Sequence, residues 1–135
     1  MIIKIKSKIK PTEDEKKVIK AIKNIFRDAD ISIFENNTLI GESKDIDRFK
    51  ELLRSQAILD TGRMVLERGI LGNSTKFIIN KQAAYSGLLN FDRDIHGGIF
   101  VKIICEENEN ILSLIKEIAP KTKDGKIISE EEDEF

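Results

Sequence analysis

The first ten residues alternate between isoleucine and lysine, and this alternation constrains the fold more than any other part of the sequence. A period of two predicts a β-strand over residues 2–10 that is buried on one face and exposed on the other. The strand favours a sheet with a layer packed on its apolar side. Two sets of side chains lie on opposite sides of the strand: Ile3, Ile5 and Ile9 on one, and Lys4, Lys6, Lys8 and Lys10 on the other.

Turn residues and helical spacing divide the rest of the chain. Thr12 and Glu15 form a capping box that predicts a helix over 13–26. Asn36 and Asn37 suit the positive φ of a two-residue hairpin turn. The patterns further predict strands over 31–35, 38–42, 75–80 and 98–106, helices over 45–55, 58–68 and 111–118, a helical turn or bulge over 81–85, and an edge strand over 88–91.

The predicted order β-α-β-β-α-α-β-β-α indicates an α+β fold. We expect a two-layer sandwich in which the helices cover one face of a mainly antiparallel sheet. The opening β-α-β-β-α order is similar to the first part of a ferredoxin-like unit. Residues 1–127 are expected to form one domain, followed by an acidic, flexible tail over 128–135.

The net charge hides a division between this tail and the rest of the chain. The whole sequence carries 23 basic and 24 acidic residues, a net charge of −1, which at first argues against a nucleic-acid binder. Five of the acids are Glu130, Glu131, Glu132, Asp133 and Glu134, so the remainder carries +4. The acidic run is typical of a solvated tail; the alternative is that it folds over a basic face and screens it.

Several classes of protein do not fit the sequence. It has no apolar run of about eighteen residues and no apolar leader, so we expect neither a membrane span nor a signal peptide. A single cysteine cannot form an intramolecular disulfide, so a reducing, cytoplasmic compartment is expected. Cys105 falls on the apolar side of a predicted strand, and His96 falls in a predicted loop, so neither indicates a nucleophile or base. Glycine-rich phosphate loops and clustered metal ligands are also missing. We therefore expect no enzyme activity, cofactor or metal.

Three groups of residues are candidates for RNA binding. The first is the row Lys4, Lys6 and Lys8, which could contact phosphates or could only protect an edge strand from aggregation. The second group lies on and between the middle helices, and its alternative role is ion pairing with Asp60 and Glu67. That group consists of Arg54, Gln56, Arg63 and Arg68.

The third group is the segment Asn80-Lys81-Gln82, which directly follows a predicted strand. Its side chains combine charge with hydrogen-bond donors and acceptors, and binding residues are frequent in such loops. The alternative is that Asn80 and Gln82 satisfy backbone groups where the strand bends. The residues alone leave the two roles open.

The sequence resembles an archaeal family, the uncharacterised protein family numbered zero-two-zero-one. The resemblance rests on Ile58-Leu59-Asp60-Thr61-Gly62-Arg63, on Asn80-Lys81-Gln82-Ala83-Ala84 with Gly87 and Asn90-Phe91, and on weaker matches over nearly the whole chain. Where the family has Pro-Leu-Gly, this chain has Ile95-His96-Gly97. The resemblance implies the fold of the ribosomal protein that binds 5S rRNA, and from it an RNA-binding role. It implies no catalytic or ligand residues.

Two functions follow as hypotheses. One is a non-catalytic protein that recognises structured RNA through basic side chains and the Asn-Lys-Gln loop. The other is a homo-oligomerising interaction module, such as a homodimer, that uses the open face of the sheet. Apolar residues expected on that face are Ile40, Ile78, Phe100 and Ile104.

Deleting residues 128–135 tests whether the tail screens a basic face. The truncated chain is expected to bind polyanions more tightly than the whole chain, because the deletion removes five negative charges. Retention on heparin and titration with labelled RNA measure the difference. Equal affinity of the two chains would mean that the tail acts only as a solubilising segment.

Overall fold

The computed structural model describes residues 1–92, 97–123 and 126–127. His96 and the acidic tail over 128–135 lie outside the described residues. The strands are β1 (Ile2–Lys8), β2 (Asp30–Phe34), β3 (Thr38–Ser43), β4 (Ile70–Leu71), β5 (Ser74–Ile79), β6 (Ile99–Ile104), β7 (Thr122–Lys123) and β8 (Lys126–Ile127). The helices are α1 (Glu15–Ile25), α2 (Asp47–Ser55), α3 (Leu59–Arg68), α4 (Lys81–Tyr85) and α5 (Ile111–Ile118), with a 3₁₀ turn at Glu35–Asn37.

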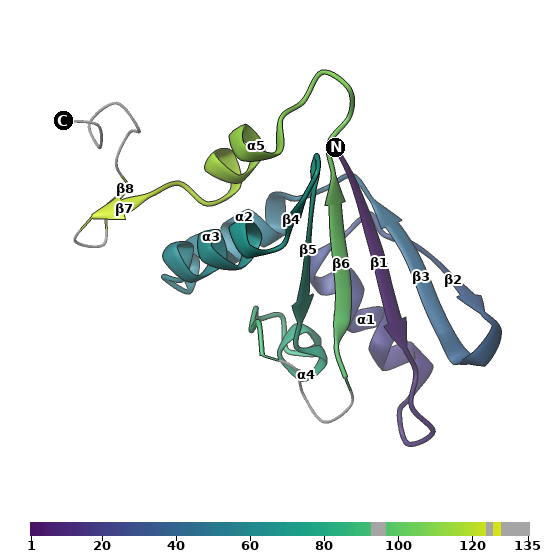
Figure 1. The fold of residues 1–135 in the computed structure, drawn as a ribbon. Helices are drawn as coiled ribbons and strands as arrows, with labels where there is room; N and C mark the ends of the chain where they lie inside the picture. Colours follow the sequence, from purple (N-terminus) through teal and green to yellow (C-terminus); the bar gives the residue numbers. More distant parts are fainter. Residues whose placement is uncertain (93–96, 124–125, 128–135) are drawn as a thin grey trace.

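Six strands form an antiparallel sheet in the order β2-β3-β1-β6-β5-β4, and β7 pairs with β8 separately. Figure 1 shows α1, α2 and α3 behind the sheet, with the opposite face uncovered by helices. The predicted α+β architecture is therefore confirmed. Among the described residues, no helix combines the length and the apolar character that crossing a membrane requires.

The alternation of the first strand is confirmed in β1. Ile3, Ile5 and Ser7 are buried beneath the helices, whereas the intervening lysines are exposed. Ser7 is tolerated there because its hydroxyl donates a hydrogen bond to the backbone oxygen of Gly98 at 3.0 Å. The strand ends at Lys8, earlier than predicted, and the half-buried Ile9 packs against the edge of the core.

An aromatic cluster joins the helices to the sheet. Phe49 of α2 is fully buried, and its ring centroid lies 6.3 Å from Phe26 at the end of α1 and 5.4 Å from Phe77 of β5. Phe91, which follows α4, packs edge-on against Phe49 at 6.3 Å. The cluster contributes dispersion and burial energy across four segments that are distant in sequence.

Gly62 lies inside α3 because the preceding helix passes very close to it. A Cβ atom at this position would lie 2.5 Å from Cδ2 of Leu53, a buried residue of α2. The close helix contact compensates for the low helix propensity of glycine. The predicted helix is confirmed, and Gly69 occupies its C-cap as expected.

The predicted capping box at the start of α1 is wrong. Asp14, not Thr12, is the N-cap, and its carboxylate accepts a hydrogen bond from the backbone N–H of Lys16 at 3.0 Å. The helix begins later than predicted because Glu13 closes a turn onto Lys10, with a backbone bond of 2.9 Å and a side-chain bond of 2.8 Å.

The predicted edge strand over 88–91 is also wrong. The backbone N–H and C=O of Leu89 bond the side chain of Gln56 at 2.7 and 2.9 Å, so they cannot pair with a strand. The place beside β5 is taken by β4, through the pairs Ile70–Thr75 and Leu71–Ser74. The hairpin between β2 and β3 lies at the other edge of the sheet. Asn36 and Asn37 have the positive φ that was predicted for its turn, 61° and 53°. The turn contains three residues and not the predicted two, because Phe34 pairs with Thr38.

Replacing Phe49 by alanine is expected to lower the free energy of unfolding by about 3–5 kcal/mol, because it removes the ring at the centre of the aromatic cluster. Phe34→Ala is the matched control, since Phe34 on β2 is 57% exposed. Urea denaturation of both variants measures the effect as a shift of the midpoint at unchanged slope. Equal shifts for the two variants would contradict a central role for Phe49.

Candidate nucleic-acid interface

The register of the sheet brings three lysines into one row on its uncovered face. Lys4 of β1 pairs with Lys102 of β6, and Lys102 pairs with Lys76 of β5. Adjacent strands are about 4.8 Å apart, so the three backbone positions are close neighbours. Like charges in directly opposite positions destabilise a sheet by up to about 1 kcal/mol per pair. This arrangement therefore favours a bound anion.

The same row becomes acidic towards the β2 edge. Lys4 also pairs with Glu42 of β3, which in turn pairs with Asp30 of β2. The Lys4 ammonium hydrogen-bonds Glu42 Oε1 at 2.9 Å and, with its charge, holds the pKa of that carboxyl below its ordinary value. The uncovered face is consequently basic over β1, β6 and β5 and acidic over β3 and β2.

The next row of the face is mainly apolar. Lys6 of β1 lies between Ile40 of β3 and Phe100 of β6, and Phe100 pairs with Ile78 of β5. Phe100 is 46% exposed and Ile40 is 39% exposed, both large values for apolar residues within a sheet. Two residues of strand separate the rows, which is about 7 Å. A cationic row and an apolar row thus run side by side across the central strands.

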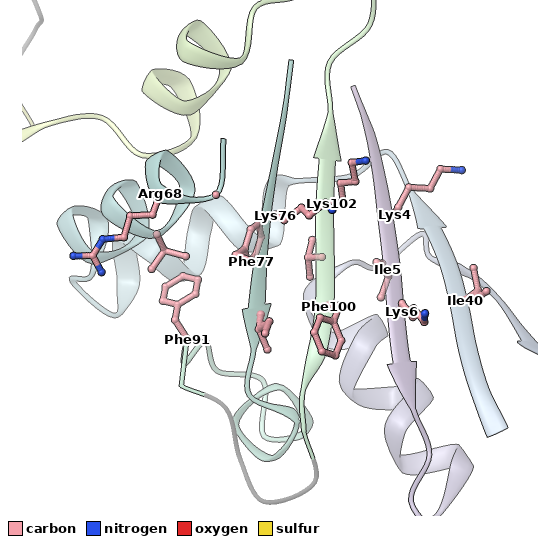
Figure 2. Close-up of a pocket in the computed structure, with 14 residues that line it drawn as sticks. Lys4, Ile5, Lys6, Ile40, Arg68, Lys76, Phe77, Phe91, Phe100 and Lys102 are labelled. Atoms are coloured by element: carbon pink, nitrogen blue, oxygen red, sulfur yellow. The ribbon is translucent and has the colours of Figure 1, made fainter. Parts of the chain in front are cut away.

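A groove of about 760 Å³ follows these two rows and continues over the edge of β5 to the end of α3 (Figure 2). The described residues that line it include five cations and no acid. Its apolar lining includes Phe100 and Ile78 of the sheet, Val65 of α3, and Phe91. The cations are Lys4, Lys6, Arg68, Lys76 and Lys102.

The lysine row predicted on β1 is therefore exposed, as an RNA contact requires. Lys4, Lys6 and Lys8 are each exposed on the uncovered face. The structure adds Lys76 and Lys102, which the sequence analysis did not single out as candidates. Their outward positions follow from strand alternation, but their alignment with Lys4 depends on the register between strands.

The second predicted group lies on the helical side and is occupied by contacts within the protein. Arg54 donates to the backbone oxygen of Lys50 at 3.1 Å, and Arg63 pairs with Glu67 at 2.8 Å. Gln56 anchors the backbone after α4, as described above. Of this group only Arg68, at the end of α3, reaches the groove on the sheet face.

The third predicted group divides between structural and exposed positions. Asn80 is the N-cap of α4 and accepts from the N–H of Ala83 at 2.9 Å. Lys81 is only 4% exposed, and its ammonium bonds Glu13 at 3.0 Å and the backbone oxygen of Lys8 at 2.6 Å. Gln82 is exposed and lines a second cavity of about 490 Å³ between α1 and α4.

Other candidate chemistry is sparse in the part of the chain that the structure describes. Cys105 is buried beyond the end of β6, and burial raises the pKa of its thiol, so it is poorly suited to act as a nucleophile at neutral pH. Among residues 1–92, 97–123 and 126–127, no three potential metal ligands gather at one place.

The sequence of this chain matches a family model and is similar to known archaeal proteins. A family model described as "RNA binding" matches residues 2–105. The chain is 57% identical to the UPF0201 protein MJ1564 of Methanocaldococcus jannaschii, over 98% of this chain and 80% of that protein. It is 37% identical to the UPF0201 protein TK1335 of Thermococcus kodakarensis, over 91% and 92% of the two chains.

A solved structure has the same fold. The crystal structure of a UPF0201 protein from Methanococcus jannaschii is similar to this chain with a TM-score of 0.92 and 55% identity, over 96% of this chain and 100% of that chain. The further likeness to the ribosomal protein that binds 5S rRNA stays a prediction.

Removal of the buried Lys81 ammonium tests whether this residue supports the fold. Lys81→Ala is expected to destabilise the protein by about 3–5 kcal/mol, because it leaves Glu13 with a largely buried, uncompensated charge. The control Lys8→Ala removes an exposed lysine and is expected to change stability by less than about 0.5 kcal/mol. Urea denaturation measures both.

A second variant separates charge from packing at this site. The pair Lys81→Met with Glu13→Leu is expected to recover most of the lost stability, since neither charge then remains buried alone. If Lys81→Ala proved as stable as Lys8→Ala, the ion pair would have no structural role.

Proposed function

The chain belongs to the UPF0201 family of archaeal proteins, and on that premise we propose that it binds structured RNA without catalysing a reaction. The observation that carries the proposal is the cationic half of the uncovered sheet face. Lys4, Lys102 and Lys76 are aligned there by strand pairing, and Lys6 lies in the next row. The match to an RNA-binding family model over residues 2–105, which include all of these strands, supports the same role.

Phosphate contacts supply the binding energy in this proposal. Each lysine that neutralises a phosphate releases condensed counterions, and this release makes the affinity fall with added salt. The lysines extend from paired strands of one sheet. The main ordering cost of binding is therefore the loss of rotamer freedom of the lysine side chains. Shape, phosphates and 2′-hydroxyls are the features of structured RNA that such a surface recognises.

The predicted Asn-Lys-Gln loop is the cap and first turn of α4, and it has a narrower role in RNA binding. Asn80 and Lys81 hold the start of this helix in place through the helix cap and the pair with Glu13. Gln82 has an exposed side chain and is the member proposed to contact RNA. Arg54 and Arg63, on the helical side, are proposed only as peripheral phosphate contacts.

The alternative is a homo-oligomer that buries the uncovered face, and the apolar residues Ile40, Ile78 and Phe100 support it. A twofold dimer, however, places the same patch of both copies in contact. The described lining of the groove carries five cations and no acid, so a dimer centred there would bring like charges together in a poorly solvated interface. At the groove itself, this charge pattern favours a polyanion over a second copy.

The variant Lys4→Glu, Lys6→Glu, Lys8→Glu tests the proposal. Its affinity for a fluorescein-labelled RNA hairpin is expected to be at least tenfold weaker at low salt, and the slope of log affinity against log salt about 2–3 shallower. Fluorescence anisotropy measures both, and circular dichroism checks that the variant is folded.

The matched control is Lys16→Glu, Lys23→Glu, Lys116→Glu, which makes the same change of net charge on exposed helical positions. This control is expected to retain most of the affinity. Equal losses in the two variants would indicate that only the total charge matters. If the wild-type chain did not bind the hairpin at low salt, or if its affinity did not change with salt, RNA binding would be refuted.

A further inference from the structure

The groove on the uncovered face has a chemical character that phosphate binding alone does not explain. We propose that it holds an unpaired nucleotide of the RNA, with the base against Phe100 and the flanking phosphates on the row Lys4, Lys102 and Lys76. This inference rests on the proposed RNA binding and adds the position of the site and the class of RNA that it selects.

Phe100 is exposed in the middle of the uncovered face. Its ring lies on β6, a central strand, and is 46% exposed beside Lys6 on β1 (Figure 2). On the other side, Phe100 pairs with Ile78 of β5. A large aromatic group in the middle of a sheet face is a platform on which any base can stack, because every base presents a π-face. A fully paired stem has no free base face to offer to this ring.

Positive charge surrounds the ring of Phe100. The cationic row lies about 7 Å along the strands from the apolar row that holds Phe100. Lys6 belongs to the apolar row, so cations approach the ring from two directions. A nucleotide combines an apolar planar base with an anionic phosphate, and this combination matches the two rows.

The size and composition of the groove also suit a nucleotide. Its volume of about 760 Å³ lies within the range of small-ligand sites, large enough for a nucleotide and too small for a duplex. Its described lining contains no acid that would repel a phosphate. On the β3 side, Glu42 pairs with Lys4 and the face becomes acidic, which limits the anionic ligand to β1, β6 and β5.

The groove offers one aromatic platform on the sheet, and this limits the RNA that it selects. Phe34, the other exposed phenylalanine of the sheet, lies on the edge strand β2 beyond the acidic half of the row. We therefore infer a bulged or looped-out nucleotide within a structured RNA, and not a run of stacked single-stranded bases. Stacking without hydrogen bonds to base edges also predicts little preference among the four bases.

Two RNA duplexes without loops, one fully paired and one with a single bulged nucleotide, test the inference with the full-length chain. The wild-type chain is expected to bind the bulged duplex about tenfold more tightly than the paired one, in fluorescence anisotropy at fixed salt. Phe100→Leu is expected to remove this preference and to retain the affinity for the paired duplex. The control Phe34→Leu, at an exposed phenylalanine outside the groove, is expected to keep the preference.

A second readout reports stacking directly. With 2-aminopurine as the bulged nucleotide, the wild-type chain and Phe34→Leu are expected to change its fluorescence, and Phe100→Leu is expected not to. The variant Lys76→Gln, Lys102→Gln is expected to weaken the binding of both duplexes and to make the salt slope about 1.5–2 shallower, because two phosphate contacts are lost.

The possible failures are distinguishable. Equal, tight binding of both duplexes by the wild-type chain would overturn the unpaired-nucleotide site and leave the proposed RNA binding intact. No binding of either duplex would overturn both. Light scattering tests whether a second copy occupies the groove. If the wild-type chain were a dimer and the Phe100→Glu variant a monomer, the occupant would be a second copy and the inference would be overturned.

Discussion

The position of β1 between β3 and β6 is the constraint on which the rest of the structure depends. Its two ladders place Ile3 and Ile5 towards the helices and Lys4, Lys6 and Lys8 towards the uncovered face. A slip of one residue in either ladder would reverse both faces, burying lysines and exposing isoleucines. The core that holds Phe49 and the surface that carries Lys4 are therefore two consequences of the same hydrogen-bonding register.

This register also separates basic from acidic side chains on the uncovered face. Along one row the residues run from Asp30 and Glu42 to Lys4, Lys102 and Lys76. Neighbouring opposite charges stabilise the β3–β1 side of the row, and neighbouring like charges are left at the β1, β6 and β5 side. The protein thus concentrates unbalanced positive charge beside Phe100, although its total charge is close to zero. The net charge of the chain is a poor guide to such a surface.

The prediction of the fold succeeded where local signals were strong and failed where distant partners decided the structure. The strand alternation, the asparagine turn and the helices with apolar stripes were predicted from neighbouring residues. The edge strand over 88–91 was wrong because the side chain of Gln56, 33 residues away, takes both backbone groups of Leu89. The start of α1 was wrong because Glu13 is held by a turn onto Lys10 and by Lys81, 68 residues away.

By itself the sequence determined most of the strands and helices and that the lysines of the first strand share one side, because both follow from the periodicity of side chains along the backbone. Only the tertiary structure decided which of the candidate cations act together. It placed Lys81 inside the protein and aligned Lys76 and Lys102 with Lys4, since cross-strand register and burial depend on contacts between segments far apart in the chain.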